Sequence, residues 1–530
     1  MTTATRARPR VATAPAGAEN DVRLEMFNAF MNCPHRDTEV AQKIHADLRE
    51  KDPSFYAHLA AWYRHQGDQL RDHNELFSAM LMTDPYIENR EVGLALFRDH
   101  ATFMKDRIVG FIKGKVAKIR EKTGKKIKVG KAMHDEVKIT EKKVGLGKSL
   151  PTSLKTEIGD FLEWLEADPT RFDAVVLKNG KALKDLYYAK GNHPYKHSER
   201  AQKVLFEKEY PKDSKLNVLK EITEAKTPEK AAKLIVENKL PYSVAVGLVD
   251  KITPTVLVAL IDAMSPQEVI NNMASLQAQG ALENPDTKKL IEDKLEKAKK
   301  SSHVSSLKAK TAVGTGRIKD EGIAKKLDDV ADVQVMKTGT IKVSTAVFVD
   351  RSGSMSEAIE VGKSVSALIS GVTTADLYVV TFDDSPMEIK STGKTLSDWE
   401  RAFKPVRPGG STSMACALRY LQAKKMVVEQ IVFITDEGEN CSPNFAAVYP
   451  EYCKAFNVKP HVVVIHVGGP DNTFTTSLKR ADIPFDLYNP KSKDNYSLPG
   501  LVTLLSRKSK LDLVIEIMDV PLPTRKAFRL

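Results

Sequence analysis

Apolar residues recur at helical spacing from about Asp21 to Leu327 of the chain. They fall three, four, seven or eight residues apart, which places them on one face of a helix. Three such stripes are Leu76, Phe77, Met80 and Leu81; Met104, Ile108, Phe111 and Ile112; and Val269, Met273 and Leu276. The pattern predicts many amphipathic helices that pack against their neighbours.

Proline and glycine with polar neighbours interrupt these stripes at short intervals. Thr227-Pro228-Glu229 and Ser265-Pro266-Gln267 have the form of an N-cap residue followed by proline in the first helical position. Short helices with short connections favour stacked helix pairs of the solenoid type, although no repeat of fixed length is visible in the sequence.

The pattern changes near Val335, where short continuous apolar runs begin. Five runs are predicted as strands, at 345–349, 377–382, 431–435, 461–465 and 484–488. Helical segments lie between them, for example from Glu357 to Ile369 and from Asn444 to Phe456. Apolar strands that alternate with helices are typical of a parallel sheet covered on both faces.

We therefore predict an α plus α/β protein, with a helical half followed by a doubly wound parallel sheet. The expected parts are a flexible basic arm over residues 1–20, a helical domain over 21–335 and a sheet domain over 336–530. A chain of 530 residues is too long for one ordinary hydrophobic core, which agrees with this division.

The composition is that of a soluble protein, with 42% hydrophobic and 28% charged residues. No apolar run is long enough for a transmembrane helix, and the first residues lack the apolar centre of a secretory signal. Four cysteines without a CxxC pair are not a disulfide scaffold. These features favour a cytoplasmic protein.

The net charge of +12 favours polyanionic partners, and it is unevenly distributed. Between Met104 and Leu150, thirteen Lys and two Arg face five acidic residues, a local net charge of +10. Such a run is compatible with a solvated helix face or a mobile basic loop. In a basic protein it is also a candidate for contact with nucleic acid.

Three groups of polar residues follow or flank the predicted strands of the second half. Asp350, Ser352 and Ser354 come after the first strand, Gly409-Gly410-Ser411-Thr412 precedes a helix, and Asp436 follows the third strand. Ligands of parallel sheets bind outside the carboxyl ends of the strands. Carboxylate and hydroxyl oxygens suit Mg²⁺, and also Ca²⁺ or Mn²⁺, better than zinc.

These residues resemble the metal-ion-dependent adhesion site (MIDAS) of von Willebrand factor A (vWA) domains at all five positions. The metal ligands that the resemblance implies are Asp350, Ser352, Ser354, Thr412 and Asp436. Ser411 competes with Thr412, which is preferred because its spacing from Ala417-Leu418 resembles the vWA pattern. The alternative is that Ser352 and Ser354 only cap the following helix.

The sequence contains no GxSxG, HExxH or P-loop motif, and no general base is evident beside the predicted metal site. A binding role is therefore favoured over catalysis, and the chain is predicted not to be an enzyme.

A helical array followed by a MIDAS-bearing vWA domain resembles the Ro autoantigen family, which is built on the TROVE domain. In the helical half, the segments 75–113, 145–161 and 183–205 resemble family segments. In the second half, DRSGSM, PGGSTSM and ITDEGEN match well. The family fold is a HEAT-repeat-like ring of helices closed by the vWA domain.

The resemblance implies an RNA-binding protein that takes small noncoding Y-like RNA and the single-stranded ends of misfolded RNA. It also implies a chaperone or scaffold that works with a 3′ exoribonuclease such as polynucleotide phosphorylase, as bacterial members of the family do. The apolar stripes suit packing on neighbouring helices and the sheet should be self-contained, so a monomer is predicted. The candidate RNA-binding residues are Lys113, Lys115, Lys118, Arg120, Lys148, Lys190, His193, Lys196, His197 and Arg200.

Two further predictions concern the segment from Lys190 to Arg200 and the tyrosines in and beside it. The resemblance places it and the +10 segment at the central hole of the ring or its rim. Tyr187, Tyr188 and Tyr195 are candidates for stacking unpaired bases, and packing within the helices is the alternative for each.

Two rival functions remain open at the sequence level. One is a vWA adaptor for an AAA+ ATPase that binds a protein carboxylate through the metal ion, and this reading predicts no preference for RNA. The other is a metal-dependent enzyme, which the missing general base disfavours.

Overall fold

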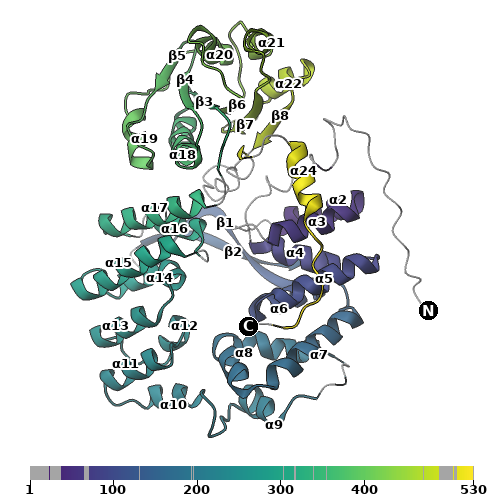
Figure 1. The fold of residues 1–530 in the computed structure, drawn as a ribbon. Helices are drawn as coiled ribbons and strands as arrows, with labels where there is room; N and C mark the ends of the chain where they lie inside the picture. Colours follow the sequence, from purple (N-terminus) through teal and green to yellow (C-terminus); the bar gives the residue numbers. More distant parts are fainter. Residues whose placement is uncertain are drawn as a thin grey trace.

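The computed structural model describes Arg23 and residues 38–64, 71–129, 132–191, 194, 196–301, 304–314, 318–337, 340–353, 355–468, 471–488, 505–506 and 510–528. Helices form the first part of the chain, and a six-stranded sheet with its helices forms the second (Figure 1). This is the fold class that the sequence predicts.

The helical half runs from α2 to α17. Its first helices are α2 Thr38–Lys51, α3 Pro53–Arg64, α4 Arg71–Met82, α5 Ile87–Asp99 and α6 Thr102–Lys113. They are followed by α7 Thr152–Glu166, α8 Pro169–Ala189, α9 Glu199–Ala201, the π-helix η1 Gln202–Glu207, α10 Asn217–Thr223, α11 Pro228–Glu237 and α12 Tyr242–Ala245. The last are α13 Pro254–Ala263, α14 Pro266–Ala278, α15 Pro285–Lys300, α16 Ser306–Gly314 and α17 Glu321–Met336.

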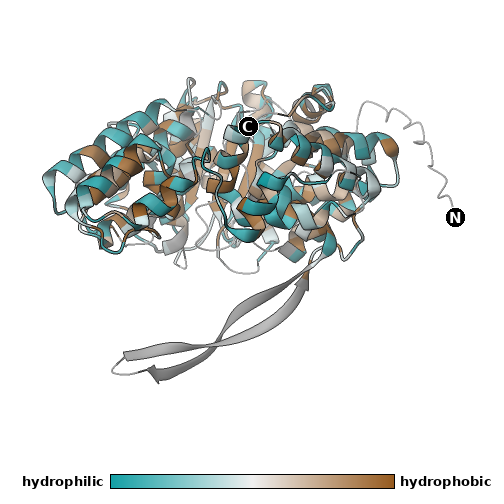
Figure 2. Cartoon of the chain, turned by 90° about the horizontal axis from the view of Figure 1, so that it is seen from below, coloured by the Kyte–Doolittle hydropathy of each residue, from teal (hydrophilic) through white to brown (hydrophobic). Residues whose placement is uncertain are grey.

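Each helix packs mainly on helices close to it in the sequence, as in a solenoid. The predicted apolar stripes are buried, since Phe77, Ile108 and Met273 are all almost fully covered. Apolar residues gather between neighbouring helices, while hydrophilic residues cover the outside (Figure 2). Together the helices follow a ring-like path (Figure 1).

Both predicted helix starts are confirmed. The Thr227 side chain accepts a hydrogen bond from the Lys230 backbone at the start of α11. At the start of α14, Ser265 and Glu268 form a reciprocal capping box. In each helix, proline occupies the first turn, where its missing N–H has no acceptor to lose.

A two-stranded antiparallel hairpin interrupts the helical half where only helices were expected. Strand β1 spans Lys115–Val129 and β2 spans Ala132–Val144. The sequence reading of this basic segment as a helix face or a loop was therefore wrong. The alternation of basic and apolar residues in Lys115-Val116-Ala117-Lys118-Ile119-Arg120 is the period of a strand.

The sheet of the second half has the strand order β5-β4-β3-β6-β7-β8. The strands are β3 Thr345–Asp350, β4 Leu377–Phe382, β5 Pro386–Ile389, β6 Gln430–Thr435, β7 His461–His466 and β8 Phe485–Tyr488. All pairs are parallel except β4 with β5. The helices are α18 Ser356–Val372, α19 Leu396–Phe403, α20 Met414–Ala423, α21 Phe445–Phe456 and α22 Thr473–Arg480.

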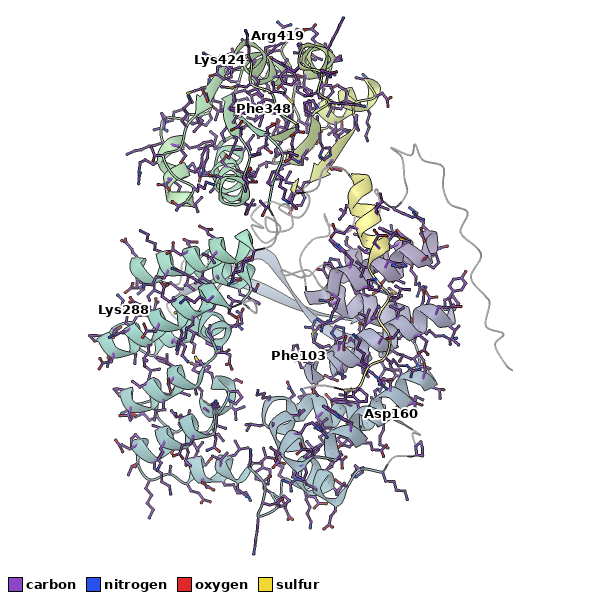
Figure 3. The ribbon with its side chains drawn as sticks, in the orientation of Figure 1. Phe103, Asp160, Lys288, Phe348, Arg419 and Lys424 are labelled. Carbon is purple, nitrogen blue, oxygen red and sulfur yellow. The ribbon has the colours of Figure 1, made fainter. Side chains whose placement is uncertain are left out.

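The chain leaves β3 toward β4 on one side and returns to β6 on the other. The sheet therefore changes direction between β3 and β6, which is where such sheets bind ligands. The residues at the centres of the strands are buried, and Phe348 lies inside the sheet domain (Figure 3).

The sheet domain contacts the helical half at both ends of the helical path (Figure 1). On one side α17 packs on α18. On the other side α24, Lys510–Asp519, packs on α3, where Glu516 accepts a hydrogen bond of 2.9 Å from the Trp62 indole. Beyond α24, Phe528 packs on Phe161 and Trp164 of α7.

Candidate functional site

Three loops meet at the carboxyl ends of β3 and β6. In the loop after β3, the Arg351 carbonyl accepts a hydrogen bond of 2.8 Å from the Gly409 backbone N–H. The Thr412 carbonyl accepts another from the Cys441 backbone, 3.0 Å long, in the loop after β6. These bonds bring the three segments predicted to form the metal site together.

Asp350 ends β3 and is fully buried. One carboxylate oxygen accepts the Ser352 backbone N–H at 2.9 Å, and the other accepts the Thr435 hydroxyl at 2.8 Å. Burial raises the pKa of the Asp350 carboxyl, and the neighbouring Asp436 carboxylate raises it further. A cation placed between the two carboxylates would offset both effects.

Thr412 is buried, whereas Ser411 beside it is exposed. The Thr412 backbone N–H donates to the side chain of Asn440 at 2.8 Å, which ties it to the loop that begins with Asp436. This placement favours Thr412 over Ser411 as the hydroxyl that faces the other candidate ligands.

Asp436 is half-buried, and its carboxylate accepts the Gly438 backbone N–H at 3.1 Å. Ser352 is buried beside Asp350, and its hydroxyl bonds to that carboxylate. Ser354 lies outside the described residues. Four of the five predicted ligands therefore fall on the converging loops.

The capping alternative for Ser352 receives no support. Helix α18 begins at Ser356, and its N-cap is Met355, which makes no side-chain capping bond. The Ser352 hydroxyl bonds instead to Asp350.

The sequence analysis missed Asp383 and Asn440, which position the site. The Asp383 carboxylate forms an ion pair of 3.0 Å with Arg351, and its carbonyl accepts the Ser413 backbone N–H. Asp383 directly follows β4, just as Asp350 and Asp436 stand at the ends of β3 and β6. A carboxylate at the end of another strand was therefore the available sequence signal. Asn440 had no comparable signal, because its role depends on the loop conformation.

The donor set fits a hard divalent cation, since it consists of carboxylate and hydroxyl oxygens. Within the described part of the chain, no three His, Cys, Asp or Glu side chains group as a metal site. The predicted site has two carboxylates and otherwise hydroxyl ligands, so it is not a group of three such side chains.

The candidate RNA-binding residues fall in two places. Lys113 ends α6 and Lys148 lies after β2, and the Lys148 backbone donates to the Ile112 carbonyl at 2.8 Å, so the two share the base of the hairpin. Lys115, Lys118 and Arg120 lie on β1. The second group follows α8.

Of this second group, Lys190 is half-buried at the end of α8, and Lys196 and His197 are exposed. His193 lies outside the described residues. Arg200 pairs with Asp173 and Asp213, both at 2.8 Å. Its charge is therefore already matched within the protein.

The tyrosines beside this group differ in their surroundings. Tyr187 is buried and donates to Glu166, as the packing alternative predicts. Tyr188 is 65% exposed and meets Phe206 edge-on, with ring centres 5.7 Å apart. Tyr195 lies outside the described residues.

Phe206 connects Tyr188 to nearby cations. The Lys184 ammonium lies 4.9 Å from the Phe206 ring centre, and the His197 ring lies 5.7 Å from it. The surface formed by Tyr188, Phe206, His197, Lys184 and Lys190, here called the α8 surface, combines an exposed aromatic ring with positive charge.

Comparison with known proteins found no matching family model and no similar curated protein. Among solved structures, the chain resembles the Ro (RSR) protein of Deinococcus radiodurans, with 13% identity and a TM-score of 0.53. The match covers 94% of this chain and 96% of that protein. The chain therefore has the fold of a Ro protein over nearly its full length.

A second solved structure, proximal thread matrix protein 1 of the mussel byssus with a zinc-occupied MIDAS motif, gives a TM-score of only 0.26. Its identity is 16%, over 32% of this chain and 48% of that protein, and we draw nothing from it. No described helix is long and apolar enough to cross a membrane.

Proposed function

We propose that the protein is a non-enzymatic RNA-binding protein of the Ro type. The observation that carries the proposal is a Ro-like fold over 94% of the chain, in a protein whose helical half has basic residues around an exposed aromatic ring. The net charge of +12 supports a polyanionic partner.

The proposed ligands are a small noncoding Y-like RNA and the single-stranded ends of other RNAs. In this proposal the monomeric protein acts in the cytoplasm as a chaperone or scaffold and delivers RNA to a 3′ exoribonuclease such as polynucleotide phosphorylase. These finer features follow from the sequence resemblance to the Ro family.

The α8 surface is the proposed contact for single-stranded RNA. Proteins that bind single strands combine cationic side chains along the backbone with aromatic rings on which bases stack. Tyr188 supplies the exposed ring, and Lys184 and Lys190 supply charge. The exposed Lys196, next to His197 in the sequence, adds to this charge. Arg200 is better understood as the partner of Asp173 and Asp213.

We also propose that the site between β3 and β6 holds Mg²⁺ or a similar divalent cation. Asp350, Ser352, Ser354, Thr412 and Asp436 would supply its protein ligands. The bound ion would present a positive charge to an acidic partner group. A buried and a half-buried carboxylate near one another, with no general base evident, support a binding site more than a catalytic one.

The experiment compares single-stranded RNA binding by the wild type and by Tyr188→Ala, Tyr188→Phe and the double variant Lys190→Ala with Lys196→Ala. Loss of a stacking ring costs roughly 1–3 kcal/mol, or about 5- to 150-fold in affinity, whereas Phe keeps the ring. The double variant should reduce the salt slope by up to about 1.4.

The matched control is the double variant Lys226→Ala with Lys230→Ala, which removes two exposed lysines elsewhere in the helical half. Equal losses of RNA affinity in both double variants would mean that the α8 surface contributes only nonspecific electrostatic attraction. No RNA binding by the wild type would reject the proposed function and favour the rival, an adaptor for an AAA+ ATPase.

A further inference from the structure

A buried glutamate, Glu437, stands directly after the predicted metal ligand Asp436. Its side chain ends in a carboxyl group, yet the residue is only 2% exposed. Its backbone has a φ of 69°, in the left-handed region that residues other than glycine uncommonly adopt. Strained backbone of this kind persists only where the surrounding structure holds it, and it is concentrated at functional sites. The contacts of Glu437 show what holds it.

Both carboxylate oxygens of Glu437 are hydrogen-bonded to neighbouring elements of the sheet domain. One lies 2.8 Å from Nδ1 of His466, the last residue of β7. The other accepts the Thr475 backbone N–H at 3.1 Å and also the Thr475 hydroxyl. Thr475 lies in the first turn of α22, where N–H groups without a partner in the helix favour a negatively charged acceptor. The Glu437 side chain thus ties the loop after β6 to β7 and α22.

The Glu437 backbone connects the same elements to the other predicted carboxylate ligand. Its carbonyl accepts the Phe474 N–H at 3.1 Å, and its own N–H donates to the Thr435 hydroxyl at 3.0 Å. That hydroxyl in turn donates to the Asp350 carboxylate at 2.8 Å. A continuous chain of hydrogen bonds therefore runs from α22 through Glu437 and Thr435 to Asp350.

Asp436 lies close to the backbone on which Glu437 acts. Its carboxylate accepts the Gly438 N–H, and a Cβ on Gly438 would lie 3.3 Å from that carboxylate. A Cβ on Gly468, two residues after β7, would lie 3.4 Å from the Asp436 Cβ. The placement of the Asp436 carboxylate therefore depends on how residues 436–438 are set against the loop after β7. The bond from Glu437 to His466 fixes this relation.

We propose that Glu437 is a positioning residue of the metal site, which holds the Asp436 carboxylate where a divalent cation requires it. The inference rests on the proposed metal site. Glu437 is not itself a ligand, because its oxygens are engaged by His466 and Thr475. Loss of a group that orients a metal ligand typically lowers metal affinity about 10- to 100-fold.

A purely structural role for Glu437 is the alternative, in which its bonds only fasten α22 to the sheet. A structural role affects the temperature of unfolding, whereas a positioning role affects the Mg²⁺ affinity of the folded protein. Both quantities are measurable on the full chain, by thermal unfolding without metal and by isothermal titration with Mg²⁺.

The first test compares Glu437→Gly with Glu437→Gln. Glycine adopts the left-handed backbone without strain, so Glu437→Gly removes the side-chain bonds and leaves the backbone conformation accessible. Its Mg²⁺ affinity should fall about 10- to 100-fold. Glu437→Gln keeps an oxygen that can accept the Thr475 N–H, and it should lose less than about fivefold.

The matched control is Asp482→Gly. Asp482 is exposed, has a φ of 53° and lies just beyond α22, so this variant also places glycine at a left-handed position of the sheet domain. Its Mg²⁺ affinity should equal that of the wild type. A milder variant, Thr475→Val, removes the hydroxyl donor to Glu437 and keeps the backbone N–H. It should lower the Mg²⁺ affinity measurably, and less than Glu437→Gly does.

Wild-type Mg²⁺ affinity in Glu437→Gly, with or without a lower unfolding temperature, would make Glu437 purely structural and overturn the inference. Equal losses in Glu437→Gly and Glu437→Gln would also overturn it, because the charge alone would then matter. If Glu437→Gly does not fold, Thr475→Val decides, and an unchanged affinity there rejects the inference. If the wild type itself binds no Mg²⁺, the proposed metal site fails, and the inference fails with it.

Discussion

At the residue scale, the predicted metal site depends on a small number of oxygen ligands whose order along the chain is informative. Asp350 at the end of β3, Asp436 directly after β6 and Thr412 before α20 were identifiable because each stands beside an apolar strand or a helix start. Asp383, which follows β4, carried a similar signal and was missed. Asn440 was not identifiable, because its contact with Thr412 depends on how the loops fold back on one another.

Replacing Asp350 by Asn should abolish Mg²⁺ binding without unfolding the sheet domain. The amide keeps an oxygen that accepts the Ser352 N–H, so the loop retains its bond while the charge is lost. Isothermal titration with Mg²⁺ and thermal unfolding measure the two effects. The exposed Asp384→Asn serves as the control, and unchanged Mg²⁺ affinity in Asp350→Asn would reject the site.

His100 provides a test of pH dependence. It is buried and shares a hydrogen bond of 2.9 Å with Ser78. Burial lowers its pKa to about 3, with smaller contributions from Arg64 and Lys105. The folded protein therefore keeps the ring neutral, while the unfolded chain takes up a proton below a pH of about 6.5.

The stabilisation from neutral His100 is full above a pH of about 6.5 and is lost as the pH falls toward 3. At a pH of ~4.5 the loss is about 3 kcal/mol, since each pH unit contributes a little over 1 kcal/mol. Urea denaturation of the wild type and His100→Gln at both ends of this range measures it. If the unfolding free energy changes with pH equally in the two proteins, the assignment to His100 is contradicted.

At the element scale, the sequence predicts elements best where local signals agree. Thr227 and Ser265 start helices as expected, because cap, proline and apolar spacing all point the same way. All five predicted strands are present. The sixth strand, β5, was missed because it has four residues, begins with proline and lies at the sheet edge.

In the β1–β2 hairpin, a high density of charged residues obscures the strand pattern in the sequence. Lysines dominate β1, so its apolar positions read as isolated residues in a charged run. No hydrophobic face is present to mark a strand buried on one side. The two strands become visible only through their pairing and the shared anchor at α6, which involve residues far apart in the sequence.

At the scale of the whole molecule, two contacts join the sheet domain to the helices. The chain itself links α17 to α18, whereas α24 reaches α3 across more than four hundred residues of sequence. Leu513, Val514 and Ile517 of α24 share one hydrophobic core with Phe55 and Leu59 of α3. No local pattern in the sequence predicts this pairing, since both faces are simply apolar.

The whole-molecule prediction is that the α24 contact closes the ring. Ile517 is fully buried on α24, whereas Ile515 on the same helix is 48% exposed. Ile517→Ala should cost about 2–5 kcal/mol of unfolding free energy, because it removes buried methyl groups and leaves a cavity. Ile515→Ala, the matched control, should cost less than about 1 kcal/mol.

Ile517→Asp tests the geometry directly, because a carboxylate cannot enter this apolar core without a partner. If the contact closes the ring, small-angle scattering should show a larger radius of gyration for this variant at unchanged monomeric mass, while Ile515→Asp keeps the wild-type value. An unchanged radius in Ile517→Asp, together with retained helix content, would mean that the α17–α18 side alone holds the sheet domain in place.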